Sequence, residues 1–415
     1  MGRARVLSLA VLLAAAASAQ APAELEFLPP CQGIEVTAEE AAVRLAGTVV
    51  ATLKRGRRLG ALESRDDAHK VQVFSGRTLR HGWIEAGHVR VLGDGDVDLA
   101  AEALGVAKKL NLEADVPALL AQVAALREKV TEAAQGARGP QARFRAIRRV
   151  LFREEGFRYH KGAHRLDRVL SEKMGNCISL SLLYLAVARD LGMPLRAVSV
   201  PKHAFVRYDD GRRRFNIEAS ITGVRISDAY VRRRYVQKGR PAPKLLSDLE
   251  LVGMMMGQAG NDLALRGEHE RAHELFARAV ELAPRSSETY HNWGSCLLAL
   301  RRNPQAADKF ARAVRCDPGN VGARNAWAVA LSKMGQTRSA CQQLARIVEA
   351  DPRHADAWFN WGTTLLRMGK ARQAREKFAR AVALKPELEP LAEEMLDQAP
   401  SGEFDTRTWE PVRPR

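Results

Sequence analysis

The chain has 415 residues, of which 46% are hydrophobic and 27% are charged. This composition excludes a disordered, collagen-like or disulfide-scaffold protein, and the length suggests about two to four domains. Lys and Arg number 65 against 48 Asp and Glu, so the formal net charge is +17 and an anionic partner is expected. An aromatic content of only 6% disfavours a base-stacking surface for single-stranded nucleic acid. Five cysteines are too few for a disulfide framework.

Residues 1–19 have the pattern of a secretory signal peptide. Arg3 and Arg5 precede an apolar run of about 12 residues, and the segment ends on Ala17-Ser18-Ala19, a small-x-small cleavage pattern. The run is too short to span a bilayer, and no later stretch reaches the ~18 apolar residues of a membrane helix. We therefore predict a secreted or periplasmic protein without a transmembrane span after signal removal.

Residues 33–93 form a β-rich segment, because short β-branched and apolar runs alternate there with glycines. This spacing predicts a small barrel or sandwich. The stretches 52–56 (TLKRG), 71–73 (VQV) and 82–84 (GWI) resemble a bacterial SH3-type domain. The resemblance implies a barrel that binds peptide or cell-wall material. The alternative is that Trp83 is an ordinary core residue.

Residues 97–195 are mostly helical in pattern. Apolar residues follow helical spacing from Leu99 to Leu126, and the Gly-Pro segment 136–140 interrupts them. Further helices are predicted over about 141–155 and 167–173, the second ending near Gly175.

Residues 253–387 contain an internal repeat of 34 residues. The recurring positions are Pro284, Pro318, Pro352 and Pro386; Ala272, Ala306, Ala340 and Ala374; Trp293, Trp327 and Trp361; and Phe276, Phe310 and Phe378. The pattern resembles the tetratricopeptide repeat, which implies four helical hairpins with the aromatic residues in their core and a groove for a protein or peptide. Residues 388–415 are predicted to be a capping helix and a disordered tail.

Cys177 stands where a glycine turn leads into an apolar helix that closes near Gly192. At a helix N-terminus, the dipole and the free N–H groups stabilise a thiolate, which is the nucleophilic form of cysteine. The same N–H groups can stabilise an oxyanion. The other four cysteines show no metal-ligand spacing.

Two strands joined by a hairpin follow this helix. His203 begins the first strand, Asp209-Asp210-Gly211 marks the turn, and residues 213–218 form the second strand. A two-residue loop at 210–211 pairs 209 with 212, and a four-residue loop over 209–212 gives the same register. Either loop sets His203 opposite Glu218. Asn216 would lie on the same face, opposite Phe205. A three-residue loop would turn Glu218 away.

The stretches 175–185 (GNCISLSLLYL), 191–194 (LGMP) and 201–207 (PKHAFVR) resemble the transglutaminase-like superfamily, and within it the SirB1 N-terminal branch. The resemblance implies a papain-like α+β core over about 97–250, with Cys177 as the nucleophile and His203 as its general base. The third residue of the family is usually Asp. Here Glu218 is favoured by register, and Asn216 is the alternative.

The fold class is thus a multidomain chain with a small SH3-like β-barrel, an α+β papain-like core and an all-α repeat solenoid. The favoured function is an exported thiol enzyme, a cysteine peptidase, amidase or acyl transferase, that acts on amide bonds without metal or cofactor. The alternative is an inert envelope scaffold that binds partners through its repeats. Expected partners are a protein or peptide and an anionic envelope polymer. Nucleic acid is disfavoured despite the arginine runs 212–214 and 232–234.

Overall fold

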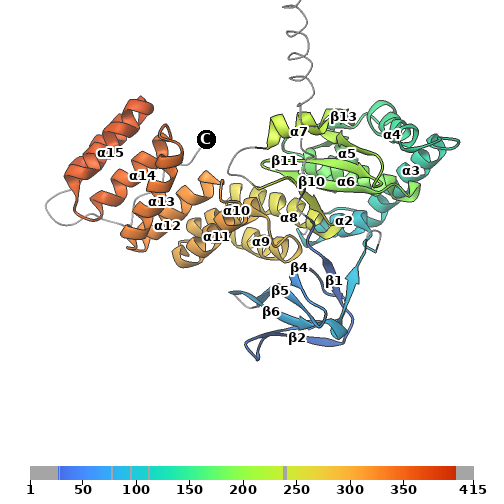
Figure 1. Cartoon of the computed structure of the whole chain (residues 1–415), viewed down its shortest axis with the longest axis horizontal. Coiled ribbons are helices and arrows are strands. Elements are labelled where there is room, and N and C mark those ends of the chain that lie inside the picture. Colours follow the sequence, from blue (N-terminus) through green and yellow to red (C-terminus); the bar gives the residue numbers. More distant parts are fainter. Residues whose placement is uncertain are drawn as a thin grey trace, which may run out of the picture.

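A computed structural model describes residues 27, 29–75, 78–93, 96–110, 113–236 and 241–398 (Figure 1). The predicted signal segment 1–19 and the predicted disordered tail lie outside these residues. The predicted fold class is confirmed in its order of parts: an antiparallel sheet, a mixed α/β region and a run of helices. No helix in the described ranges combines the length and apolar character that a membrane crossing needs.

The N-terminal part is a seven-stranded antiparallel sheet in the order β3-β2-β6-β5-β4-β1-β7. Alternate residues face a core that includes Ile34, Leu59, Val71 and Ile84, all fully buried. Trp83 neighbours Ile84 on the opposite face and is only half-buried, beneath the Arg65 guanidinium, so it is not a core residue of the sheet. The strands are β1 (Gly33–Val36), β2 (Glu40–Leu45), β3 (Thr48–Lys54), β4 (Arg58–Ser64), β5 (Ala68–Ser75), β6 (Thr78–Glu85) and β7 (Val89–Leu92).

The middle part packs helices against a five-stranded antiparallel sheet in the order β13-β12-β11-β10-β14. Its central helix α6 (Cys177–Ala188) is apolar on all sides, and every one of its residues is buried. The predicted helix over 141–155 is α4 followed by a π-helical segment, Arg149–Glu154.

The helices of this part are α2 (Leu99–Lys109), α3 (Val116–Ala133), α4 (Pro140–Arg148), α5 (Leu166–Glu172), α6 and α7 (Asp228–Tyr235). Its strands are β8 (Arg158–Tyr159), β9 (Met174–Gly175), β10 (Leu195–Val200), β11 (His203–Asp209), β12 (Arg214–Glu218), β13 (Val224–Ile226) and β14 (Lys244–Leu246).

The C-terminal part stacks four helical hairpins. The repeated alanines and phenylalanines are buried between paired helices, as the 34-residue period predicts. The prediction that all three repeat tryptophans are core holds for Trp293, which is fully buried, whereas Trp327 and Trp361 are half-buried. The helices are α8 (Asp248–Leu265), α9 (His269–Leu282), α10 (Ser287–Ala299), α11 (Asn303–Cys316), α12 (Val321–Lys333), α13 (Thr337–Ala350), α14 (Ala355–Leu366), α15 (Ala371–Leu384) and the capping helix α16 (Glu389–Asp397).

The first repeat contacts both other parts of the molecule (Figure 1). Helix α8 packs against α2 and α6, while α9 packs against β4 and β5. At the second junction, the buried Gln72 donates a hydrogen bond to the Val280 carbonyl (2.6 Å). The buried Glu281 carboxylate also pairs there with Arg57, which directly precedes β4, and with Arg278 (2.7 Å). The repeats are therefore docked on the rest of the chain rather than attached by a linker.

Candidate active site

The Cys177 residue opens helix α6, as predicted, and its neighbour Asn176 caps that helix. The Asn176 Oδ1 atom accepts hydrogen bonds from the backbone N–H groups of Ile178 and Ser179, each at 3.0 Å. In return, the Ser179 hydroxyl accepts one from the Asn176 N–H (2.9 Å), which completes a capping box. The thiol therefore lies at the positive end of a rigid, well-capped helix.

The turn before the cysteine requires a glycine. A Cβ atom on Gly175 would lie 2.8 Å from Leu180 Cγ and 2.9 Å from Ser179 Oγ, closer than real atoms approach. The preceding Lys173 takes a left-handed backbone conformation (φ 55°) that ends α5. Two short parallel strands, β8 and β9, then bring Tyr159 beside Gly175. This local geometry explains the Gly-Asn-Cys sequence.

His203 and Glu218 lie on adjacent strands and contact each other directly. His203 Nε2 is 2.7 Å from Glu218 Oε2, and only 16% of the histidine side chain and 1% of the glutamate side chain are exposed. The second carboxylate oxygen accepts hydrogen bonds from the Ser220 hydroxyl (2.7 Å) and the Ser220 N–H (3.2 Å). Both oxygens of Glu218 are thus engaged as acceptors, which fixes the carboxylate.

The surroundings of His203 favour its protonated form. Burial by itself lowers the pKa of His203, but hydrogen bonds with Cys177 and Glu218 and the charges of both groups raise that pKa to about 9. The Tyr235 ring from α7 stacks on the imidazole, with centroids 4.9 Å apart and planes at 15°. The structure therefore brings Cys177, His203 and Glu218 together in one cluster.

Asn216 is not in contact with His203. It accepts a hydrogen bond from Arg207 Nη1 (2.8 Å) and donates one to the Asp228 carboxylate (2.6 Å). The alternative that Asn216 orients the histidine is therefore not supported by the geometry.

The predicted hairpin register is wrong by two residues: Asn216 pairs with Arg207, and Asp209 pairs with Arg214. The cause is the turn, where Asp210 Oδ1 accepts hydrogen bonds from two successive backbone N–H groups, those of Arg212 and Arg213. The loop therefore spans 210–213. A slip of two residues keeps each side chain on its face, so Glu218 still reaches His203.

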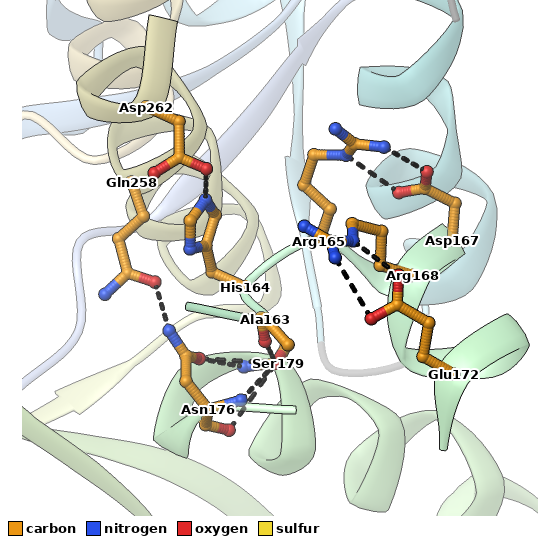
Figure 2. Close-up of polar contacts among 10 residues, drawn as sticks. All are labelled: Ala163, His164, Arg165, Asp167, Arg168, Glu172, Asn176, Ser179, Gln258 and Asp262. Atoms are coloured by element: carbon orange, nitrogen blue, oxygen red, sulfur yellow. Dashed lines mark hydrogen bonds and ion pairs between the residues drawn. The ribbon is translucent and has the colours of Figure 1, made fainter. Parts of the chain in front are cut away.

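Three further residues at the site carry no recognisable sequence signal. Tyr235 covers the imidazole, as described above. Tyr159 is half-exposed and lies beside Gly175, two residues before Cys177, and desolvation together with the charges of Cys177 and Glu218 raises its pKa. Gln258, from the first repeat helix, accepts a hydrogen bond from Asn176 Nδ2 at 2.8 Å, as Figure 2 shows. All three depend on tertiary packing.

Within the described ranges, no group of three or more His, Cys, Asp or Glu side chains has the arrangement of a metal site. The remaining cysteines are free thiols at buried or half-buried positions. Burial raises the pKa of Cys31 and of Cys296 to about 12 and also raises the pKa of Cys316 and of Cys341. These four thiols are therefore protonated and poorly nucleophilic at neutral pH.

Comparison with known proteins gives partial matches. A UPF0162 protein found in two strains of Xylella fastidiosa is 39% identical over 74 residues, which cover 16% of this chain and 26% of that protein. The F-box only protein 21 of Mus musculus is 48% identical over 46 residues, or 11% of this chain and 7% of that protein. The chain thus spans about a quarter or less of the length of these relatives.

Among solved structures, YrrB, a tetratricopeptide-repeat protein with an unusual peptide-binding site, is 26% identical with a TM-score of 0.33. It covers 35% of this chain and 77% of its own. MamA is 19% identical with a TM-score of 0.31, covering 33% of this chain and 81% of its own. Residues 117–253 match the transglutaminase-like superfamily, and residues 258–321 and 325–389 match the tetratricopeptide repeat. The predicted resemblance is confirmed: a transglutaminase-like domain occupies the middle of the chain, and tetratricopeptide repeats follow it.

Proposed function

We propose that this protein is an exported thiol enzyme that cleaves or exchanges amide bonds. The observation that carries the proposal is the cluster in which Cys177, at a capped helix N-terminus, contacts His203 while Glu218 binds the Nε2 atom of that histidine. This is the nucleophile, base and orienting-group arrangement of thiol hydrolases.

The chemistry follows from the positions of these groups. Because Glu218 occupies Nε2, Nδ1 of His203 is the nitrogen left to take the thiol proton. The Cys177 sulfur then attacks the amide carbonyl carbon, and the carbonyl electron pair moves to the oxygen. The first N–H groups of a helix lack acceptors within the helix. The Asn176 Oδ1 atom accepts hydrogen bonds from the N–H groups of Ile178 and Ser179. The Cys177 N–H is then the group left to bind the oxyanion.

The intermediate collapses when His203 returns its proton to the amine that leaves, and an acyl-enzyme remains on Cys177. Attack by water, deprotonated by His203, releases the acid and gives a peptidase or amidase. Attack by a second amine forms a new amide and gives an acyl transferase. In either case the repeats supply binding surface for a protein or peptide substrate, and the excess of Lys and Arg over Asp and Glu favours an anionic envelope.

One observation favours the inert scaffold as a second candidate: Cys177 is only 8% exposed. A thiol this enclosed reacts only if a substrate can reach it. The scaffold function would leave the repeats to bind partners and the thiol without a role.

Labelling with iodoacetamide at neutral pH separates the two functions. Peptide mass spectrometry reports each cysteine separately, and the four thiols with raised pKa values serve as internal references. The enzyme proposal expects Cys177 to react faster than a free peptide thiol and His203→Ala to slow it at least about tenfold. A Cys177 rate no faster than that of the free thiol, or unchanged by His203→Ala, would support the scaffold.

A further inference from the structure

We infer that the first repeat helix, α8, holds the nucleophile helix α6 in its reactive arrangement, with Gln258 as the positioning residue. The inference rests on the proposed role of Cys177 and assigns a part of that site to the repeats. It means that the tetratricopeptide repeats of this chain are a component of the catalytic unit as well as a binding surface.

The side-chain amide of Asn176 connects α6 with α8, because its oxygen and its nitrogen bind partners on different helices (Figure 2). Its oxygen caps α6 by accepting the N–H groups of Ile178 and Ser179. Its nitrogen donates to Gln258 Oε1 at 2.8 Å, across 82 residues of sequence. Asn176 is 4% exposed, so water has little access to take the place of this acceptor.

An asparagine amide can rotate by half a turn and exchange its oxygen and nitrogen. In the rotated form, the Asn176 NH₂ group would face the backbone N–H groups of α6, donor against donor, and the cap would be lost. An acceptor placed at the nitrogen favours the capping orientation. Gln258 is that acceptor, so it acts on Cys177 through the orientation of Asn176.

A second contact, one helical turn further along α8, holds the segment 163–164, which hydrogen-bonds to the start of α6. Asp262 lies four residues after Gln258, on the same face of the helix. Its Oδ2 atom is 2.5 Å from His164 Nε2. The adjacent Ala163 carbonyl accepts hydrogen bonds from the Asn176 N–H and from the Ser179 hydroxyl, both at 2.8 Å. Helix α8 thus braces both chain segments that meet at the start of α6.

The test uses the full chain and the iodoacetamide rate of Cys177, read by peptide mass spectrometry. Gln258→Met keeps the length of the side chain and removes the acceptor. We expect it to slow Cys177 labelling by about fivefold, the factor that the typical cost of losing a helix N-cap implies. Asn261→Leu is the matched control, because Asn261 lies on the same helix outside these hydrogen bonds. Its rate should stay within about twofold of the parent.

A double-mutant cycle separates orientation of the amide from general destabilisation. Asn176→Ser keeps a capping oxygen but has no amide to rotate. In that background, Gln258→Met should have no further effect. A merely structural role would instead give the same loss in both backgrounds. Gln258→Ser removes the acceptor by shortening the side chain, and the same dependence on Asn176 is expected if Gln258→Met is poorly folded.

The outcomes distinguish this inference from the proposed function. If His203→Ala slows Cys177 and Gln258→Met does not, the enzyme proposal stands and the positioning role is wrong. If His203→Ala has no effect, the enzyme proposal fails first. An equal effect of Gln258→Met with Asn176 or Ser at position 176 also overturns the positioning role.

Discussion

Replacing Glu218 by glutamine tests the electrostatics of the site, because it removes one charge with almost no change in shape. The carboxylate uses both oxygens as acceptors, one toward His203 and one toward Ser220. A glutamine has a single acceptor oxygen, so its NH₂ group must face either the imidazole or the Ser220 N–H. Facing the imidazole, it favours a neutral His203. We therefore expect Glu218→Gln to lower the pKa of His203.

The magnitude follows from the contacts. Burial opposes the charged imidazole, yet the Cys177 and Glu218 interactions raise the pKa of His203 from 6.5 to about 9. A rise of this size corresponds to about 3 kcal/mol of coupling between protonation and folding. A nearby opposite charge typically accounts for ~1–3 pKa units. Loss of the Glu218 charge should therefore lower the pKa of His203 by about one to two units.

The sign of the pH dependence follows from the same shift. The pKa of His203 is higher in the folded chain than in the unfolded chain, so protonation stabilises the fold. This stabilisation is complete below pH 6.5 and is lost as the pH rises through about 9. In Glu218→Gln, the loss of stability with rising pH should begin at the same pH as in the parent protein. It should be smaller by about 1–3 kcal/mol and should be complete at a lower pH.

Two measurements check this prediction. Histidine NMR titration of the labelled protein, assigned with His203→Ala, reports the pKa directly. Urea unfolding at pH 6 and pH 9.5 reports the difference in stability. Asn216→Ala is the control, since Asn216 contacts Arg207 and Asp228 rather than His203, and it should leave the His203 titration in place. An unchanged His203 pKa in Glu218→Gln would refute the electrostatic argument.

Three other substitutions test the packing of the chain. A Cβ atom on Gly60 would lie 2.7 Å from a backbone carbonyl oxygen of α9, so Gly60→Ala should lower the free energy of unfolding in urea by about 1–3 kcal/mol. Gly87→Ala is the control and should be nearly neutral, because a Cβ atom there would have open space around it. Glu281→Gln removes the carboxylate charge between Arg57, whose side chain is 40% exposed, and Arg278, and should lower the free energy of unfolding by about 1–3 kcal/mol. Gly175→Ala forces a new Cβ to within 2.8 Å of a side-chain carbon in α6 and should slow Cys177 labelling, and an unchanged rate would show that the tight turn is not needed.

Much of the architecture could be predicted from local patterns. The 34-residue period located the repeats because each hairpin needs the same small and aromatic residues at the same contacts. The start of α6 was predictable because a glycine turn and an apolar run meet at Cys177. The pairing of His203 with Glu218 survived a wrong register only because strands alternate with a period of two.

What escaped prediction depends on contacts between distant segments. The Asp210 side-chain hydrogen bonds place the hairpin loop at 210–213 and so shift the register, which spacing alone does not reveal. Gln258 and Tyr235 belong to elements whose docking is set by tertiary packing, and neither lies in a motif. Trp361 looked like core from its period, yet it stacks on Trp358 at a half-buried face of the last repeat.

The docking of the N-terminal sheet on the first two repeats has a consequence for synthesis. Gln72 and Tyr290 hydrogen-bond each other across 218 residues of sequence. At the ~5–20 residues per second of translation, the sheet waits roughly 10–40 s before its partner helices emerge. During that interval its docking face, including the Gln72 amide and the face of β4 at Gly60, has no native partner. Nascent chains that stop before about residue 300 should therefore expose this face, and we expect them to be the form of the protein most prone to aggregation.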